Sequence, residues 1–185
     1  MGGLSTVDPE LVGAVLEIWD ECRFEGEDFY NQFGPRVLQR LFEIHEPSKK
    51  VFGIDEGPRV FEARCQAHAK SLVLLVDGVF QMLTNCPEQM DQVFQQLGAK
   101  HAQAGVHPGL FPHMGAAIAH TLQTFMEEEL NEDEVMAWGQ VYGALAFEIC
   151  QHIHMDEVDD DDDDDEEDVD MEGLSQGMGA VSIDQ

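Results

Sequence analysis

The sequence predicts an all-α protein, and three observations support this. Apolar residues recur three and four positions apart along most of the chain before residue 154. No segment alternates apolar and polar residues between hairpin signals. Short stretches rich in proline, glycine or polar residues, such as "GIDEGP" and "AGVHPG", separate the helical segments. About seven helices in one domain are therefore expected, and 185 residues suffice for one core.

The first two helices are predicted from their apolar faces. Residues 7–23 form the first, and Ser5 or Thr6 is expected to cap it. Residues 27–44 form the second, in which Pro35 can introduce a kink. A short helical turn, "HEPSKKVF", and a loop, "GIDEGP", are expected to follow.

The longest helix is predicted over residues 59–83, because its apolar residues share one face. The next is expected to begin at Asn85 as the cap, with Pro87 in its first turn, and to end near residue 102. Pro112 is expected to delay the regular start of the helix that follows.

A last helix is predicted to begin at "LNEDE" and to carry apolar residues as far as Ile153. The "HIH" sequence at its end, His152 to His154, is expected to be frayed, and the alternative is a stray metal site. The sequence therefore predicts helices up to this point and none beyond it.

The chain is strongly acidic, with a formal net charge of −29. The run from Asp156 to Glu172 contains acidic residues and no basic ones, and the rest of the chain is acidic as well. Such a surface repels phosphate backbones and anionic lipids, so neither nucleic acid nor a membrane surface is an expected partner. We expect a globular domain over residues 1–155 and a disordered acidic tail over residues 156–185.

Cellular location is predicted from what the sequence lacks. No apolar run is long enough to span a membrane, and no secretory signal precedes the domain, so a cytoplasmic protein is expected. The four cysteines show no paired spacing, and Cys65 and Cys150 are expected in the core. The start "MGGLST" matches an N-myristoylation site at Gly2, the alternative being a helix cap, and membrane association would require that acylation.

Two histidines, His68 and His101, lie on the apolar faces of their predicted helices. Each can be an ordinary core residue. A structural zinc site needs about four ligands, and only Cys65 is near in sequence. An apolar cavity with one or two imidazoles is instead typical of a haem site.

Residues 4–154 as a whole resemble a globin. "VLQRLFEIHEPSKKVF", "HAKSLVLLVD", "LGAKHAQAGVHPGLF" and "MAWGQVYGALAFEI" resemble, in order, the B–C, E, F–G and H segments of that family. Trp19 also lies where many globins have a tryptophan. The resemblance implies the globin fold, a three-over-three helical sandwich around haem b, here with a short CD region. The pattern resembles the intracellular neuroglobin, globin X and plant-type globins more than blood haemoglobin.

The resemblance also implies roles for particular residues. His101 would be the proximal iron ligand, its other ring N–H donating to a carbonyl near Leu97 or Gly98. His68 would be the distal residue, either donating a hydrogen bond to bound O₂ or binding the iron as a sixth ligand. The remaining pocket residues would be Leu38, Phe42, Phe52, Leu72, Leu97, Val106 and Phe111. The candidates for the haem propionates are Arg64, Ser71, Lys100 and His107.

The implied function is reversible binding of O₂, with CO and NO as further ligands, for oxygen transport or storage. The alternative is a haem redox enzyme or sensor acting on nitric oxide, nitrite or peroxide. The sequence marks no reductase domain, so such catalysis would need an outside electron donor. A third possibility is a haem-free helical module, against which Phe52, His68 and His101 argue together.

Overall fold

The structure is a computed structural model that describes residues 7–24, 28–126 and 130–153. Within these ranges it contains α-helices, short 3₁₀-helices and no β-strand, so the all-α prediction is confirmed. The α-helices are α1 (Pro9–Phe24), α2 (Phe29–Ile44), α3 (Pro58–Asn85), α4 (Met90–Gln103), α5 (Phe111–Phe125) and α6 (Glu132–Cys150). Gly2, Ser5, Thr6 and the acidic tail from residue 156 lie outside the described residues.

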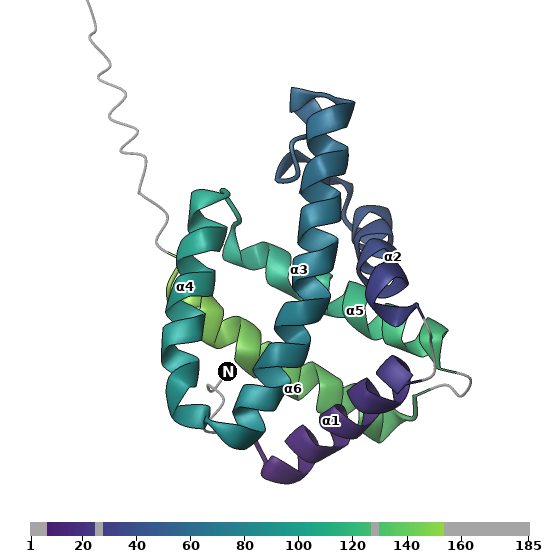
Figure 1. The fold of residues 1–185 in the computed structure, drawn as a ribbon, viewed down its shortest axis with the longest axis vertical. Coiled ribbons are helices and arrows are strands. Elements are labelled where there is room, and N and C mark those ends of the chain that lie inside the picture. Colours follow the sequence, from purple (N-terminus) through teal and green to yellow (C-terminus); the bar gives the residue numbers. More distant parts are fainter. Residues whose placement is uncertain (1–6, 25–27, 127–129, 154–185) are drawn as a thin grey trace, which may run out of the picture. The chain divides into compact units, whose positions relative to one another are not determined.

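The helices pack in two layers, which is the arrangement that the resemblance implies. Helices α1, α3 and α4 make one layer, and α2, α5 and α6 make the other, with α2 packed on α3 and α1 and α4 packed on α6. In Figure 1 the long helix α3 runs vertically, with α4 to its left and α2 to its right. Helices α5 and α6 cross behind it.

The connection between α2 and α3 is short, as expected for the CD region. Two 3₁₀-helices, Glu46–Lys50 and Ile54–Glu56, fill most of it, so the stretch predicted as a loop contains a helical turn. Gly53 has a φ of 79°, which only glycine adopts without strain. This compact connection positions Phe52 against the core, where its side chain is 8% exposed.

The helix boundaries differ from prediction at one cap. Asn85 does not cap α4: it is the last residue of α3, and its Nδ2 donates to the Gln81 carbonyl 2.9 Å away. A 3₁₀-helix, Pro87–Gln89, precedes α4 instead. The prediction is wrong because an asparagine side chain can satisfy the end of the helix it terminates as readily as the start of the next.

The last helix begins where the sequence predicts. The Asn131 side chain accepts from the backbone N–H groups of Asp133 and Glu134, and the Glu134 carboxylate accepts from the Asn131 N–H. This reciprocal capping box satisfies the free N–H groups at the start of α6. Helix α5 also begins late, at Phe111, after a 3₁₀-helix over Pro108–Leu110.

Helices α1 and α3 are joined by a core tryptophan and a half-buried ion pair. Trp19 is 1% exposed, and its ring makes edge-to-face contacts with Phe29, Phe33 and Phe80. Asp77 on α3 accepts hydrogen bonds from Trp19 Nε1 at 3.3 Å and Arg23 Nη1 at 2.8 Å. These contacts set the position of the C-terminal half of α3.

Helices α2 and α3 lie in close backbone contact at Gly34. A Cβ built on Gly34 would contact the carbonyl oxygen of Ala69, and would lie 2.7 Å from its carbonyl carbon. No side chain fits at that distance, so glycine permits the crossing. The crossing lies next to His68 and therefore sets where this histidine enters the interior.

No disulfide joins any of the four cysteines, all of which lie in the described ranges. Cys65 and Cys150 are half-buried rather than fully buried, and burial raises the pKa of both thiols. In the part of the chain that the structure describes, none of the helices has the length and apolar character needed to cross a membrane.

Candidate functional site

A large cavity of about 580 Å³ lies between the two helical layers. Helices α3 and α4 line one side, and α5 and α6 line another. Its wall is mostly leucine, valine, isoleucine and aromatic side chains, with two histidines among them. This size and character are typical of a pocket for an organic cofactor or ligand.

His101 enters the cavity from α4, and its ring is held in one orientation. The ring Nδ1 lies 2.7 Å from the backbone oxygen of Leu97. A carbonyl oxygen only accepts hydrogen bonds, so Nδ1 must carry the hydrogen. In the neutral ring, the other nitrogen, Nε2, then has its lone pair available for a metal ion.

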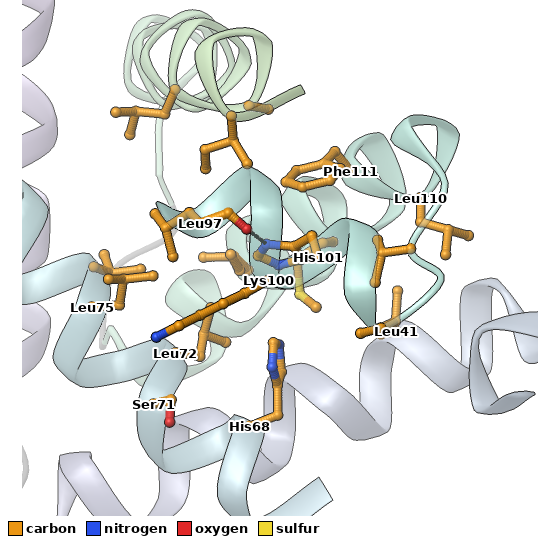
Figure 2. A pocket seen from close by; sticks show the side chains of 18 of the residues that line it. Leu41, His68, Ser71, Leu72, Leu75, Leu97, Lys100, His101, Leu110 and Phe111 are labelled. Atoms are coloured by element: carbon orange, nitrogen blue, oxygen red, sulfur yellow. Dashed lines mark hydrogen bonds between the residues drawn. The ribbon is translucent and has the colours of Figure 1, made fainter. Parts of the chain in front are cut away.

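His68 enters from α3 on the opposite side. Figure 2 shows the two imidazoles pointing toward one another across the cavity. Burial, and secondly the nearby His101, lower the pKa of His68 from its ordinary 6.5 to about 4. The His68 ring is therefore neutral at physiological pH. The Phe52 ring packs edge-on against it, with centroids 5.3 Å apart.

The structure brings most of the predicted pocket residues to this one cavity. Those on its wall are Phe52, His68, Leu72, Leu97, His101, Val106 and Phe111. Phe111 also packs on His101, with ring centroids 5.3 Å apart. Residues that are 59 positions apart in sequence, Phe52 and Phe111, thus face the same space.

Leu38 and Phe42 do not line the cavity, contrary to expectation. Leu38 is 3% exposed and belongs to the core behind the wall. Phe42 packs on the rings of Phe52 and Phe61, with centroids 5.3 and 5.5 Å apart. The apolar face of α2 is covered by α3 and α5, so these two side chains support the cavity wall instead of forming it.

The fold and this arrangement of histidines match a known family, whose sequence model, described as Globin, matches residues 35–149. The chain belongs to the globin family. A relative, the flavohemoprotein of Rhizobium meliloti (strain 1021), is 26% identical to this globin over 121 residues. That match covers 62% of the globin but only 28% of the relative, so the chain spans less than a third of the relative's length.

Globins are haem-binding proteins that bind diatomic gases such as O₂, and the donors in this globin fit that cofactor. His68 is a neutral imidazole, His101 donates from Nδ1 to the Leu97 carbonyl, and imidazole nitrogens are good iron ligands. The apolar wall suits the porphyrin face, and the structure places no acidic side chain on it. A group of three or more histidine, cysteine or acidic side chains able to hold a bare metal ion is absent from the described ranges.

Polar groups of the globin lie at the rim of the cavity, where the haem carboxylates would be expected. Arg64, Ser71 and Lys100 all contribute to the lining. Figure 2 shows Lys100 extending toward the segment of α3 that carries Ser71 and Leu72. Arg64 already pairs with Glu56, its two Nη atoms lying 2.6 and 3.0 Å from the carboxylate oxygens.

His107, the fourth predicted rim group, does not line the cavity. Its Nδ1 accepts from the backbone N–H of Gly109 at 3.0 Å and so caps the 3₁₀-helix Pro108–Leu110. A histidine just before proline is well placed for such a cap. This role explains why His107 does not line the cavity although it is close to His101 in sequence.

Several residues that line the cavity were not predicted from the sequence as pocket residues. They lie on α3, α4, α5 and α6 and include Val76, Phe94, Met114, Trp138, Tyr142 and Ile149. The helical periodicity marks them as inward-facing, but it does not separate cavity wall from solid core. That distinction depends on how the helices cross.

Proposed function

We propose that this globin binds haem b between His68 and His101 and binds O₂ reversibly, for oxygen transport or storage. The observation that carries the proposal is the pair of imidazoles facing each other across one apolar cavity, with His101 Nδ1 donating a hydrogen bond to the Leu97 carbonyl oxygen. When bound, haem supplies an iron atom that takes a diatomic ligand. CO and NO are expected to bind as well.

His101 is the proposed proximal ligand, acting through Nε2. The hydrogen bond to the Leu97 carbonyl fixes the ring tautomer and makes Nε2 a better donor. The Phe111 ring limits rotation of the imidazole from one side. Phe52, Leu72, Leu97, Val106 and Phe111 exclude water from the site.

His68 is the proposed distal residue and can act in two ways. As a neutral imidazole it can donate a hydrogen bond from one ring nitrogen to the gas, a contact that contributes roughly 1.5–3 kcal/mol if the ligand carries charge. It can also bind the iron as a sixth ligand. The gas then competes with His68, which lowers the apparent affinity by the fraction of open sites.

Absorption spectra of the ferric, deoxy ferrous and CO forms test the proposal, in wild type and in His68→Leu. An intense Soret band after haem addition supports it, and no such band would end it. Split, sharp visible bands in the deoxy ferrous wild type, lost in His68→Leu, indicate that His68 binds the iron. A single broad band in both proteins indicates that it does not.

The second candidate function is a haem redox enzyme or sensor acting on nitric oxide, nitrite or peroxide. It is supported by the relative, whose name joins flavin and haem. An electron donor would then be a further partner. The rates of autoxidation and O₂ release separate the two functions, because a globin that oxidises quickly in air is a poor oxygen store.

We also propose that residues 1–155 are the globin domain, that residues 156–185 form an acidic tail, and that the protein is cytoplasmic. The unbroken acidic run in the tail supports the boundary between domain and tail. Intact mass after expression in a eukaryotic cell shows whether Gly2 is acylated, in which case membrane association is expected.

A further inference from the structure

The end of α6 lies directly against α4 at Gly98, one turn before His101. A Cβ built on Gly98 would lie 2.5 Å from the Cβ of His152 and 2.7 Å from the Ile149 oxygen. The backbone at the end of α6 therefore occupies the space that any side chain at residue 98 would take. His152 is packed against α4 here, although the sequence suggested a frayed helix end.

This contact falls on the peptide group that orients His101. The Leu97 carbonyl oxygen and the Gly98 nitrogen and Cα belong to one planar unit. The same oxygen lies 2.7 Å from His101 Nδ1. Because the end of α6 fixes the Gly98 Cα, it also fixes the direction in which the acceptor oxygen points.

Helix α6 reaches His101 by a second route. The Tyr142 hydroxyl donates to the backbone oxygen of Phe111 at 2.9 Å. The Phe111 ring packs against the His101 ring, as described above. Beyond it, Phe111, Ala146 and Ile153 form a small buried cluster that joins the end of α6 to the segment after α4.

We propose that α6 positions His101, and that Gly98 is the positioning residue through which its last turn acts. Contact at Gly98 holds the Leu97 oxygen on Nδ1, and so keeps the Nε2 lone pair directed into the cavity. The consequence for iron rests on the proposed function, whereas the control of the ring tautomer does not.

The test compares Gly98→Ala with Gly139→Ala in the full chain. A Cβ on Gly139 in α6 meets nothing within 4 Å, so this variant is the matched control. Nitrogen-15 NMR of the histidine rings, before haem addition, measures the ratio of the two His101 tautomers. In Gly98→Ala the ratio of the Nδ1–H form to the Nε2–H form should fall about fivefold, as expected from one weakened hydrogen bond. In Gly139→Ala the ratio should not change.

Haem-loaded protein gives the second readout. In a His68→Leu background, where residue 68 cannot bind iron, resonance Raman of the ferrous form reports the iron–histidine stretch. Gly98→Ala should shift or broaden this band, and Gly139→Ala should leave it unchanged. If no haem binds, the proposed function fails, while the NMR result still decides the positioning role.

A third variant removes the His152 side chain, which a Cβ at residue 98 would contact. Adding His152→Gly to Gly98→Ala removes one of the crowding atoms and should restore part of the tautomer ratio. If Gly98→Ala lowers the melting temperature but leaves the ratio and the Raman band unchanged, the contact is only structural and the proposal is wrong. If Gly98→Ala does not fold, Ile153→Ala is measured instead: a lower ratio supports the positioning role, and an unchanged ratio overturns it.

Discussion

Replacing glycine by alanine should lower the free energy of unfolding at one position of the α2–α3 helix pair and raise it at another. At Gly34, on α2, a Cβ would contact the Ala69 carbonyl oxygen and lie 2.7 and 2.9 Å from the Ala69 carbonyl carbon and Cα. At Gly78, on α3, a Cβ would meet nothing within 4 Å. Both glycines lie inside helices, so they share the same gain in helix propensity.

The magnitudes follow from that geometry. Alanine gains about 1 kcal/mol over glycine in a helix interior, so Gly78→Ala should stabilise the protein by up to about this amount. At Gly34 the clash is with backbone atoms, which cannot rotate away, so the overpacking cost should reach about 3 kcal/mol. The expected net effect of Gly34→Ala is therefore a loss of about 2 kcal/mol.

Urea unfolding followed by circular dichroism measures both free energies. For a domain of about 150 residues, a loss of 2 kcal/mol also lowers the melting temperature by roughly 4–8 °C. The reasoning is refuted if Gly34→Ala is as stable as Gly78→Ala, because the α2–α3 crossing would then not depend on a bare backbone. The displaced Ala69 also neighbours His68, so Gly34→Ala should alter CO binding where Gly78→Ala does not.

Three further predictions follow from the cap, the buried tyrosine and the rim. Asn131→Ala removes the capping box of α6 and should cost about 1 kcal/mol in urea unfolding, whereas Asn85→Ala, which removes one exposed hydrogen bond to the Gln81 carbonyl, should cost less than about 0.5 kcal/mol. Burial raises the pKa of Tyr142 above its ordinary 10.0, so the folded state holds this proton more tightly than the unfolded state. The stability that this difference contributes is present below pH 10 and is lost as the pH rises beyond it, by at most about 1.4 kcal/mol per pH unit. Tyr142→Phe should reduce the slope of the unfolding free energy against pH. Equal slopes for the two proteins above pH 10 would contradict the assignment. Lys100→Gln should speed haem transfer to an excess of apoprotein acceptor by up to about fivefold without changing the urea midpoint; an unchanged rate would remove Lys100 from the haem rim.

Helix existence was predictable because burial of one face leaves a 3.6-residue period in the sequence. The face shared by Cys65, His68 and Leu72 is real, since all three pack on the core or line the cavity. The start of α6 was predictable for a different reason, because a capping box is local and needs only Asn131 and Glu134.

The cavity wall was less predictable, because it depends on contacts between helices. Leu38 and Phe42 face inward as expected, but α3 and α5 cover that face of α2 and leave them behind the wall. His152 looked like part of a frayed end, and only the missing side chain at Gly98 gives it a place to pack. Neither contact leaves a periodic signal in the sequence.

The central claim, that His101 is the proximal ligand of a bound haem, is tested most directly by haem titration of wild type and His101→Gly. The wild type should bind one haem per chain and give a CO form whose spectrum shows an imidazole on the opposite side of the iron. His101→Gly should lose that spectrum, and added free imidazole should restore it. A wild type that binds no haem, or a His101→Gly variant whose CO form matches the wild type without imidazole, would contradict the account.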